Sequence, residues 1–152
     1  NLCSATIEQA GGKLAVRFGG MSLGIDTESL TKHPTLSDRV GKEVVLGTRP
    51  ESFFLSDGSE PDDQRIRSTV DLVEMLGAEA LVYLQTEAAP VTAMGTAERS
   101  AAEKDGNKQP SMATLVTRIA PKALPEEGAE VDMYYEPGAL HFFDPATGQA
   151  LR

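Results

Sequence analysis

Apolar and polar residues alternate along much of the chain, with the period of two residues that is typical of half-buried β-strands. Lys13 to Phe18 shows this alternation, and the glycine pairs Gly11-Gly12 and Gly19-Gly20 separate it from an extended run on each side. Paired glycines between short strands are typical of tight turns. The pattern therefore predicts a three-stranded β-meander over residues 2–25.

The rest of the chain predicts more strands and little helix. Residues 66–76 and 80–86 flank a glycine turn and predict a hairpin, with Val70 and Leu72 on one face of its first strand. A helix over residues 69–75 is the competing interpretation, because its valines could share a helical face, but the neighbouring strands favour the hairpin. Further strands are expected over residues 43–46, 113–119, 130–136 and 141–144.

One polar stretch interrupts the strands. Residues 26–39 contain several Ser, Thr and charged residues and predict one short helical turn at Leu36 to Val40. His33 precedes a proline in this stretch, and we expect its side chain to face solvent. The second histidine, His141, opens the last strand, where it could cap that strand or lie in a contact.

The strand over residues 43–46 leads into the segment Gly47-Thr48-Arg49-Pro50-Glu51. Pro50 has no backbone N–H and biases Arg49 towards extended geometry, so the strand should end here and the chain should turn. Arg49 and Glu51 then project from a chain reversal. Such a charged pair can brace the corner or meet a neighbouring surface, and local physics alone favours bracing.

Length and composition bound the class of protein. A chain of 152 residues can form one domain with a real core. Its net charge of −9 argues against a nucleic-acid surface, which needs clustered Lys and Arg. No apolar run approaches the roughly 20 residues of a membrane span. Cys3 has no disulfide partner, and no signal-peptide pattern occurs. The lack of an initiator Met and the immediate start in strand-like sequence suggest a fragment of a longer protein, with processing as the alternative.

Motifs for catalysis, nucleotide binding and metal binding are missing from the sequence. Gly41-Lys42 is followed by Glu43, so the phosphate-loop spacing fails, and no Gly-x-Ser-x-Gly elbow occurs. Two histidines and one cysteine cannot supply a typical zinc site, and the acidic loop over residues 56–63 lacks the EF-hand spacing. We therefore expect no enzyme activity, cofactor or metal in this fragment.

Residues 87–112 differ in composition from the rest of the chain. They are mostly Ala, Glu, Thr, Ser, Lys, Asn and Gln, with prolines at positions 90 and 110. Connections inside a compact domain usually have about 4–6 residues, so a structureless loop of this length is uncommon there. We predict a flexible insertion within a single domain that spans residues 1–152.

Several motifs occur in a familiar order. They are Gly-Lys-Glu-Val-x-Leu followed by Gly-x-Arg-Pro-Glu over residues 41–51, Val-Glu-x-Leu-Gly-x-Glu over 73–79, and His-Phe-Phe-Asp-x-x-Thr-Gly over 141–148. Together they resemble the C-terminal regulatory domain of the ATP-binding subunits of carbohydrate ABC importers, the maltose, trehalose and glycerol-3-phosphate kind. This domain is called the TOBE or OB-like domain. The resemblance covers nearly all of the chain except the insertion and implies an all-β, OB-fold-like small barrel with additional strands.

The resemblance also implies a role in regulation and dimerisation. The parent protein would be an ATPase at the cytoplasmic side of the inner membrane, with ATP and Mg bound in its own nucleotide-binding domain. The regulatory domain would stabilise a homodimer with a second copy, contact its own nucleotide-binding domain and join the permease subunits through the parent. It could also receive a regulatory protein. Arg49, Glu51, His141 and Phe142 are the candidate interdomain or dimer contacts.

A small-ligand-binding domain is the alternative function. Related OB-like domains in molybdate systems bind oxyanions through backbone amides and a few basic or hydroxyl side chains. No obvious copy of their short Ser-Ala-Arg-Asn or Lys-Ala-Thr motifs occurs in this sequence. We therefore favour the interaction module over the oxyanion-binding domain.

Overall fold

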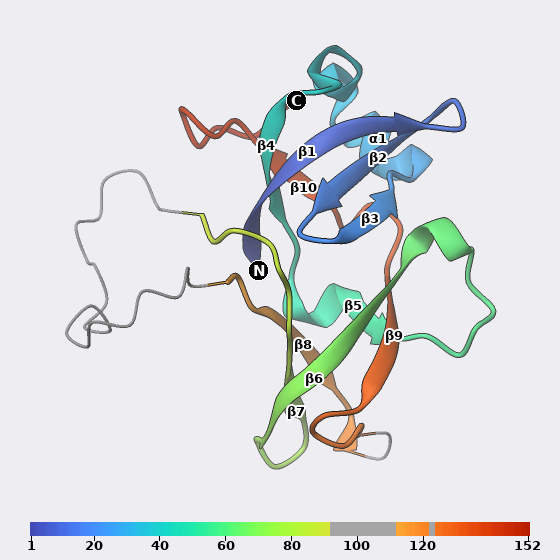
Figure 1. The fold of residues 1–152 in the computed structure, drawn as a ribbon, viewed down its shortest axis with the longest axis vertical. Coiled ribbons are helices and arrows are strands. Elements are labelled where there is room, and N and C mark those ends of the chain that lie inside the picture. The colour runs from blue at the N-terminus through green and yellow to red at the C-terminus, as the bar shows by residue number, and fades with distance from the viewer. Residues whose placement is uncertain (92–111, 122–123) are drawn as a thin grey trace.

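The computed structural model describes residues 1–91, 112–121 and 124–152. Within these residues it contains ten strands, one short α-helix and three 3₁₀ helices (Figure 1). The strands are β1 (Leu2–Ala10), β2 (Lys13–Phe18), β3 (Met21–Gly24), β4 (Glu43–Gly47), β5 (Phe53–Leu55), β6 (Arg65–Met75), β7 (Ala80–Leu84), β8 (Leu115–Ile119), β9 (Glu130–Tyr135) and β10 (His141–Phe143). The helical elements are α1 (Thr27–Lys32), η1 (Pro34–Arg39), η2 (Pro50–Ser52) and η3 (Asp62–Gln64).

The strands form two antiparallel, five-stranded sheets. The first sheet has the order β10-β4-β1-β2-β3 and the second has the order β5-β9-β6-β7-β8. In Figure 1 the first sheet occupies the upper half of the molecule and the second sheet the lower half. The edge strands β5 and β8 contact each other, so the second sheet nearly closes into a barrel. The predicted all-β, OB-fold-like architecture is confirmed, with strands beyond the five of a simple OB-fold.

Both sheets contribute to one hydrophobic core. Ile7, Val44 and Phe142 enter it from the first sheet, and Phe53 and Val82 enter it from the second. Each of these side chains is almost fully buried, and burying one of this kind contributes roughly 1.5–3 kcal/mol. A polar link accompanies the apolar contact: the hydroxyl of buried Tyr135 on β9 donates to the carbonyl of Gly24 at the end of β3. The two sheets are therefore one folding unit.

The predicted meander and hairpin are both confirmed. β1, β2 and β3 pair in sequence order, and the glycine pairs supply the turns between them. β6 and β7 also pair as the hairpin, but the register shifts between Val70 and Leu72. This bulge turns Leu72 outwards, to 42% exposed, while Val70 stays buried at 1%. The prediction that these two residues share one face is therefore wrong.

The polar stretch after β3 forms two helical elements, α1 and η1, where the sequence predicted one helical turn. The carboxylate of Asp26 accepts a hydrogen bond from the backbone N–H of Ser29 at 2.9 Å and caps α1, a helix that the sequence analysis did not predict. The expected turn at Leu36 lies in η1. His33, between these helices, is only 5% exposed, and its Nδ1 bonds the carbonyl of Leu151. The expectation that His33 faces solvent is wrong, because the C-terminal segment covers it.

Most of the predicted insertion, residues 92–111, lies outside the described residues. Its first positions belong to the packed fold. Ala88 is 1% exposed, and the carbonyl of Ala89 accepts the N–H of Ser4 at 3.0 Å. The backbone at Ala88 also approaches the turn between β2 and β3, where a Cβ at Gly19 would lie 2.7 Å from the nitrogen of Ala88.

We predict that Gly19→Ala destabilises the protein more than Gly12→Ala. Both glycines have positive φ, +55° and +83°, so alanine strains the backbone at each by roughly 1–2 kcal/mol. A Cβ at Gly12 has nothing within 4 Å, whereas one at Gly19 collides with backbone atoms that cannot move independently. Urea unfolding of the two variants measures the difference in the free energy of unfolding. Equal losses would contradict the close approach at Gly19.

Candidate functional site

The chain passes from the first sheet to the second between Gly47 and Phe53. Arg49 has φ −88° and ψ 144°, the extended conformation expected of a residue before proline. The chain then turns through η2 and enters β5. The predicted end of the strand before Pro50 is therefore confirmed.

This crossing is held from inside the fold by β8. The fully buried hydroxyl of Thr117 lies 2.6 Å from the carbonyl oxygen of Phe53 and 3.2 Å from that of Pro50, and donates to them. The side-chain amide of Asn1 donates to the carbonyl of Val116 at 2.8 Å, and its oxygen accepts the N–H of the same residue at 2.7 Å. The N–H of Thr48 donates to the carbonyl of Asn1 at 3.0 Å. The crossing is thus held at Thr48 by the backbone of Asn1 and at Pro50 and Phe53 by the hydroxyl of Thr117.

The packing around Gly47 explains why the Gly-x-Arg-Pro-Glu motif begins with glycine. It lies opposite Leu2 on β1 and opposite His141 on β10. A Cβ on Gly47 would lie 2.9 Å from Cε2 of Phe143 and 3.1 Å from Cδ2 of Leu2. The missing side chain therefore lets these two apolar groups pass over the strand and reach the same surface.

Two of the four predicted contact residues meet on that surface. Nη1 of Arg49 lies 3.4 Å from Nε2 of His141, although 92 positions separate them in the sequence. Glu51 is exposed on η2, two residues after Arg49. Phe142 is 0% exposed and belongs to the core, so its side chain offers no contact surface, and we exclude it from the candidate site.

A shallow hollow of about 300 Å³ lies beside Arg49. None of the residues that line it is acidic, and Leu2, 56% exposed, forms part of its wall. Among the described residues, no carboxylate forms an ion pair with Arg49, in contrast to Arg39 and Arg67. We call this area the Arg49 surface. Its residues are Asn1, Leu2, Gly47, Thr48, Arg49, His141 and Phe143.

The surroundings of His141 keep its imidazole neutral. Partial burial lowers its pKa, and the positive charges of Arg49 and Lys32 and the neighbouring ring of His33 lower the pKa further. The two histidine rings meet edge to face with their centroids 6.3 Å apart. An approaching carboxylate would reverse this balance, because it would stabilise both Arg49 and a protonated His141.

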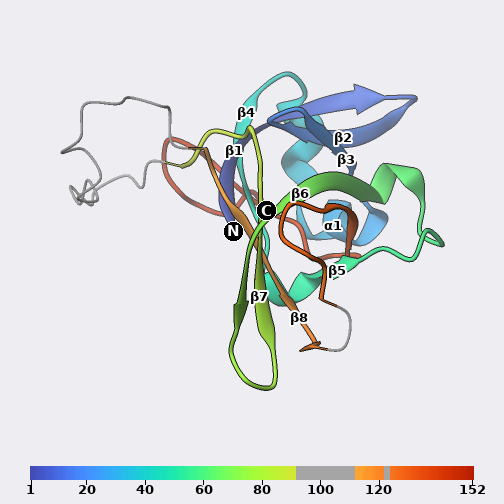
Figure 2. The ribbon, with the colours of Figure 1, turned by 60° about the horizontal axis from the view of Figure 1, so that its bottom comes forward.

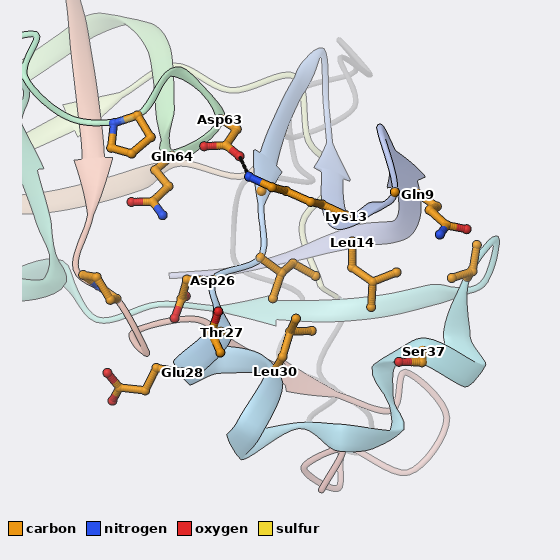
Figure 3. Close-up of a pocket in the computed structure, with 16 residues that line it drawn as sticks. Gln9, Lys13, Leu14, Asp26, Thr27, Glu28, Leu30, Ser37, Asp63 and Gln64 are labelled. Carbon is orange, nitrogen blue, oxygen red and sulfur yellow. Dashed lines mark hydrogen bonds and ion pairs between the residues drawn. The ribbon is translucent and has the colours of Figure 1, made fainter.

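A larger hollow, of about 730 Å³, lies between α1, β2 and the loop before β6 (Figure 3). Its charged groups already have partners in the fold. Lys13 pairs with Asp63 at 3.4 Å, and Asp26 caps α1 and accepts the N–H of Gly138 at 3.0 Å. Three carboxylates, those of Asp26, Glu28 and Asp63, line the hollow and oppose the binding of an anion.

The described part of the chain holds no cluster of three or more His, Cys, Asp or Glu side chains that could bind a metal ion. In the same residues, no helix is both long enough and apolar enough to cross a membrane.

Sequence reasoning missed the residues that support the Arg49 surface. Thr117 follows the alternation of β8, in which Leu115 and Thr117 point inwards, so its parity in the strand was the available signal for a buried hydroxyl. Asn1 and Leu2 carried no signal, because their roles depend on pairing with β4 and β8.

We predict that Thr117→Val lowers the free energy of unfolding by about 1–3 kcal/mol, because it leaves buried carbonyls at the crossing without a donor. Thr114→Val, three residues earlier at an exposed position, is the matched control and should change stability by less than about 0.5 kcal/mol. Urea unfolding of both variants measures this. Equal stability of the two variants would show that the hydroxyl does not support the crossing.

We also predict that His141 makes the protein less stable as the pH falls below about 6.5. The pKa of His141 in the folded state is lowered from its usual 6.5, so the unfolded chain binds a proton first. The contribution of the neutral imidazole is present above pH 6.5 and is lost as the pH falls towards the lowered pKa. His141→Gln should lose less stability than the parent between pH 7.5 and 5.5 in urea unfolding. Identical slopes would contradict the lowered pKa.

Comparison with known proteins shows which domains and proteins this chain is similar to. Residues 46–110, which include the Arg49 corner and the β6–β7 hairpin, match the model of the TOBE domain. The chain is 28% identical to the diacetylchitobiose uptake system ATP-binding protein MsiK of Streptomyces coelicolor, over 99% of this chain and 36% of that protein. It is 27% identical to the trehalose/maltose import ATP-binding protein MalK of Thermococcus litoralis, over 74% of this chain and 24% of that protein.

Among solved structures, the cytoplasmic molybdate-binding protein ModG, with molybdate bound, superposes with a TM-score of 0.58 at 16% identity. This match covers 93% of this chain and 94% of that one, and at such low identity it shows the fold alone. The chain spans about a third or less of the length of the two importer proteins. Residues 46–110, less than half of the chain, thus match the TOBE domain, and over most of its length the chain is similar to the ATP-binding proteins of sugar uptake systems.

Proposed function

We propose that this chain is the C-terminal regulatory and dimerisation domain of the ATP-binding subunit of a sugar or glycerol-phosphate ABC importer. The observation that carries the proposal is the alignment with MsiK, which runs over 99% of this chain but only 36% of that protein. The rest of such a subunit would hold the nucleotide-binding domain. ATP and Mg would bind there, since this chain has no phosphate-binding loop.

The Arg49 surface has the features of a protein contact. It combines an exposed cation, an imidazole and the exposed apolar side chain of Leu2 on backbone that is held by the buried hydroxyl of Thr117 and by the main chain of Asn1. Arginine is enriched at protein interfaces, and a rigid surface loses little entropy when it binds. Arg49, Glu51 and His141 would contact the nucleotide-binding domain or a second copy of this domain, and so steady the dimer.

The same proposal gives the location and the other partners. The parent would lie at the cytoplasmic face of the inner membrane, attached to permease subunits, and its regulatory domain could receive a regulatory protein. The acidic chain supports a protein contact rather than nucleic acid, because its net charge is −9. Oxyanion binding is less favoured, because carboxylates line the hollow between α1 and β2.

The double variant Arg49→Ala/Glu51→Ala, made in the full-length subunit of the assembled importer, tests the proposal. We expect weaker coupling, seen as about 2- to 10-fold more ATP hydrolysed for each substrate molecule transported, which is the effect of losing roughly 0.5–1.4 kcal/mol of contact energy. The assay measures ATPase activity and transport in the same proteoliposomes.

Glu8→Ala/Arg17→Ala is the matched control, because this exposed pair, 3.2 Å apart on β1 and β2, lies away from the crossing. The control should couple normally. Normal coupling in the Arg49→Ala/Glu51→Ala variant as well would refute the assignment of this corner as the contact.

A further inference from the structure

The tip of the β6–β7 hairpin exposes a group of apolar side chains that folding does not use. Leu72, Met75 and Leu76 are 42%, 57% and 58% exposed, and they lie within five consecutive positions. They are three of the seven exposed large apolar side chains among the described residues. Figure 2 shows the hairpin projecting beyond the rest of the molecule. Clustered exposure of this kind marks an interaction site more often than isolated apolar residues do.

The exposure is fixed by hydrogen bonds. The bulge after Val70 turns Leu72 outwards, and the carboxylate of Glu127 accepts the N–H of Val73 at 3.1 Å and so holds the bulge. At the turn, the N–H of Leu76 donates to the carbonyl of Glu79 at 2.8 Å. The hairpin therefore presents its apolar side chains on an ordered backbone, which reduces the entropy lost on binding.

Acidic side chains lie among and beside these apolar side chains. Successive side chains of a strand alternate between its faces, so Glu74 lies between Leu72 and Leu76 on one face and Met75 lies on the other. Among the described residues near the tip, Arg118 is the basic one, and it already pairs with Glu79 at 3.4 Å. The acidic residues are Asp71, Glu74, Glu79, Glu126 and Glu127. An apolar centre with a rim of one charge is the arrangement of a protein interface, in which the rim selects a partner of opposite charge.

We propose that the hairpin tip, residues 71–79, is a second docking site, which packs Leu72 and Leu76, with Met75 beside the turn, against the apolar face of an amphipathic helix of a partner protein whose other face carries Lys and Arg. Methionine suits this task because its flexible side chain adapts to irregular apolar surfaces. The acidic rim disfavours nucleic acid and anionic lipid, which carry the same charge. The site differs from the Arg49 surface and does not depend on the proposed role in the importer.

The test uses the 152-residue chain, labelled with ¹⁵N, and a synthetic 18-residue helical peptide with leucines on one face and lysines on the other. We expect saturable shifts of backbone amide signals confined to residues 71–82 and 116–118. Leu72→Ser and Leu76→Ser should each weaken binding about tenfold, because each removes one buried apolar contact. Binding should also weaken as salt is raised.

Two matched control variants, Val40→Ser and Glu136→Gln, make the test specific. Val40→Ser removes an apolar side chain of the same exposure, 42%, away from the tip, and should leave binding unchanged. Glu126→Gln should weaken binding about twofold to fivefold, whereas Glu136→Gln, which is exposed elsewhere, should not. Each variant is exposed, so an unchanged amide spectrum outside the altered position confirms that it is folded.

Three results would overturn the proposal. The first is a set of amide signal shifts that fall outside the hairpin and β8. The second is equally strong binding of a peptide that has the same composition in scrambled order. The third is binding to vesicles of phosphatidylcholine with no binding to the peptide, which would assign the tip to a membrane surface instead.

Discussion

The fold depends on the crossing of the chain between its two sheets, and the buried hydroxyl of Thr117 stabilises that crossing. Two sheets can share one core only if the chain crosses between them, and a crossing takes backbone carbonyls out of the strand ladders into the interior. Those carbonyls need donors. β8 supplies one through Thr117, which bonds the carbonyls of Pro50 and Phe53 on the neighbouring η2 and β5. The crossing is thereby fixed without a regular strand pair.

The surface of the corner follows from this internal fixation. Because the backbone is held from behind, Arg49 and Glu51 are left on the outside, and Gly47 leaves room for Leu2 and Phe143 beside them. Local physics alone favoured bracing as the role of Arg49 and Glu51, whereas the structure favours contact with a neighbouring surface. The crossing is held by the hydroxyl of Thr117 and the main chain of Asn1, and Arg49 adds only its approach to His141 on β10. The charged groups are thus available for a neighbour.

The two proposed surfaces differ in chemistry. The Arg49 surface offers positive and apolar groups and lacks acidic residues in its hollow, whereas the hairpin tip offers apolar groups inside an acidic rim. Surfaces of opposite charge on one small domain discriminate between partners, because each disfavours the partner of the other through like-charge contact. A domain of this kind could hold its place in a complex through one surface and receive another protein through the second.

The sequence by itself determined the features that depend on neighbouring residues. Alternation gave the strands, Gly11-Gly12 and Gly19-Gly20 gave the turns of the meander, and Pro50 gave the end of β4. It also contained the motifs that resemble those of TOBE domains. A backbone that has lost an N–H donor or gained a positive φ is constrained locally, so these features can be predicted without knowledge of distant contacts.

Only the tertiary structure decided which side chains reach the surface. His33 is buried because the C-terminal segment covers it, and Phe142 points into the core because β10 pairs with β4 in one register. A bulge held by Glu127 turned Leu72 outwards, against the alternation. Arg49 and His141 meet although 92 positions separate them. Burial and proximity depend on pairing between segments far apart in the sequence, and the local pattern of apolar and polar residues does not encode that pairing.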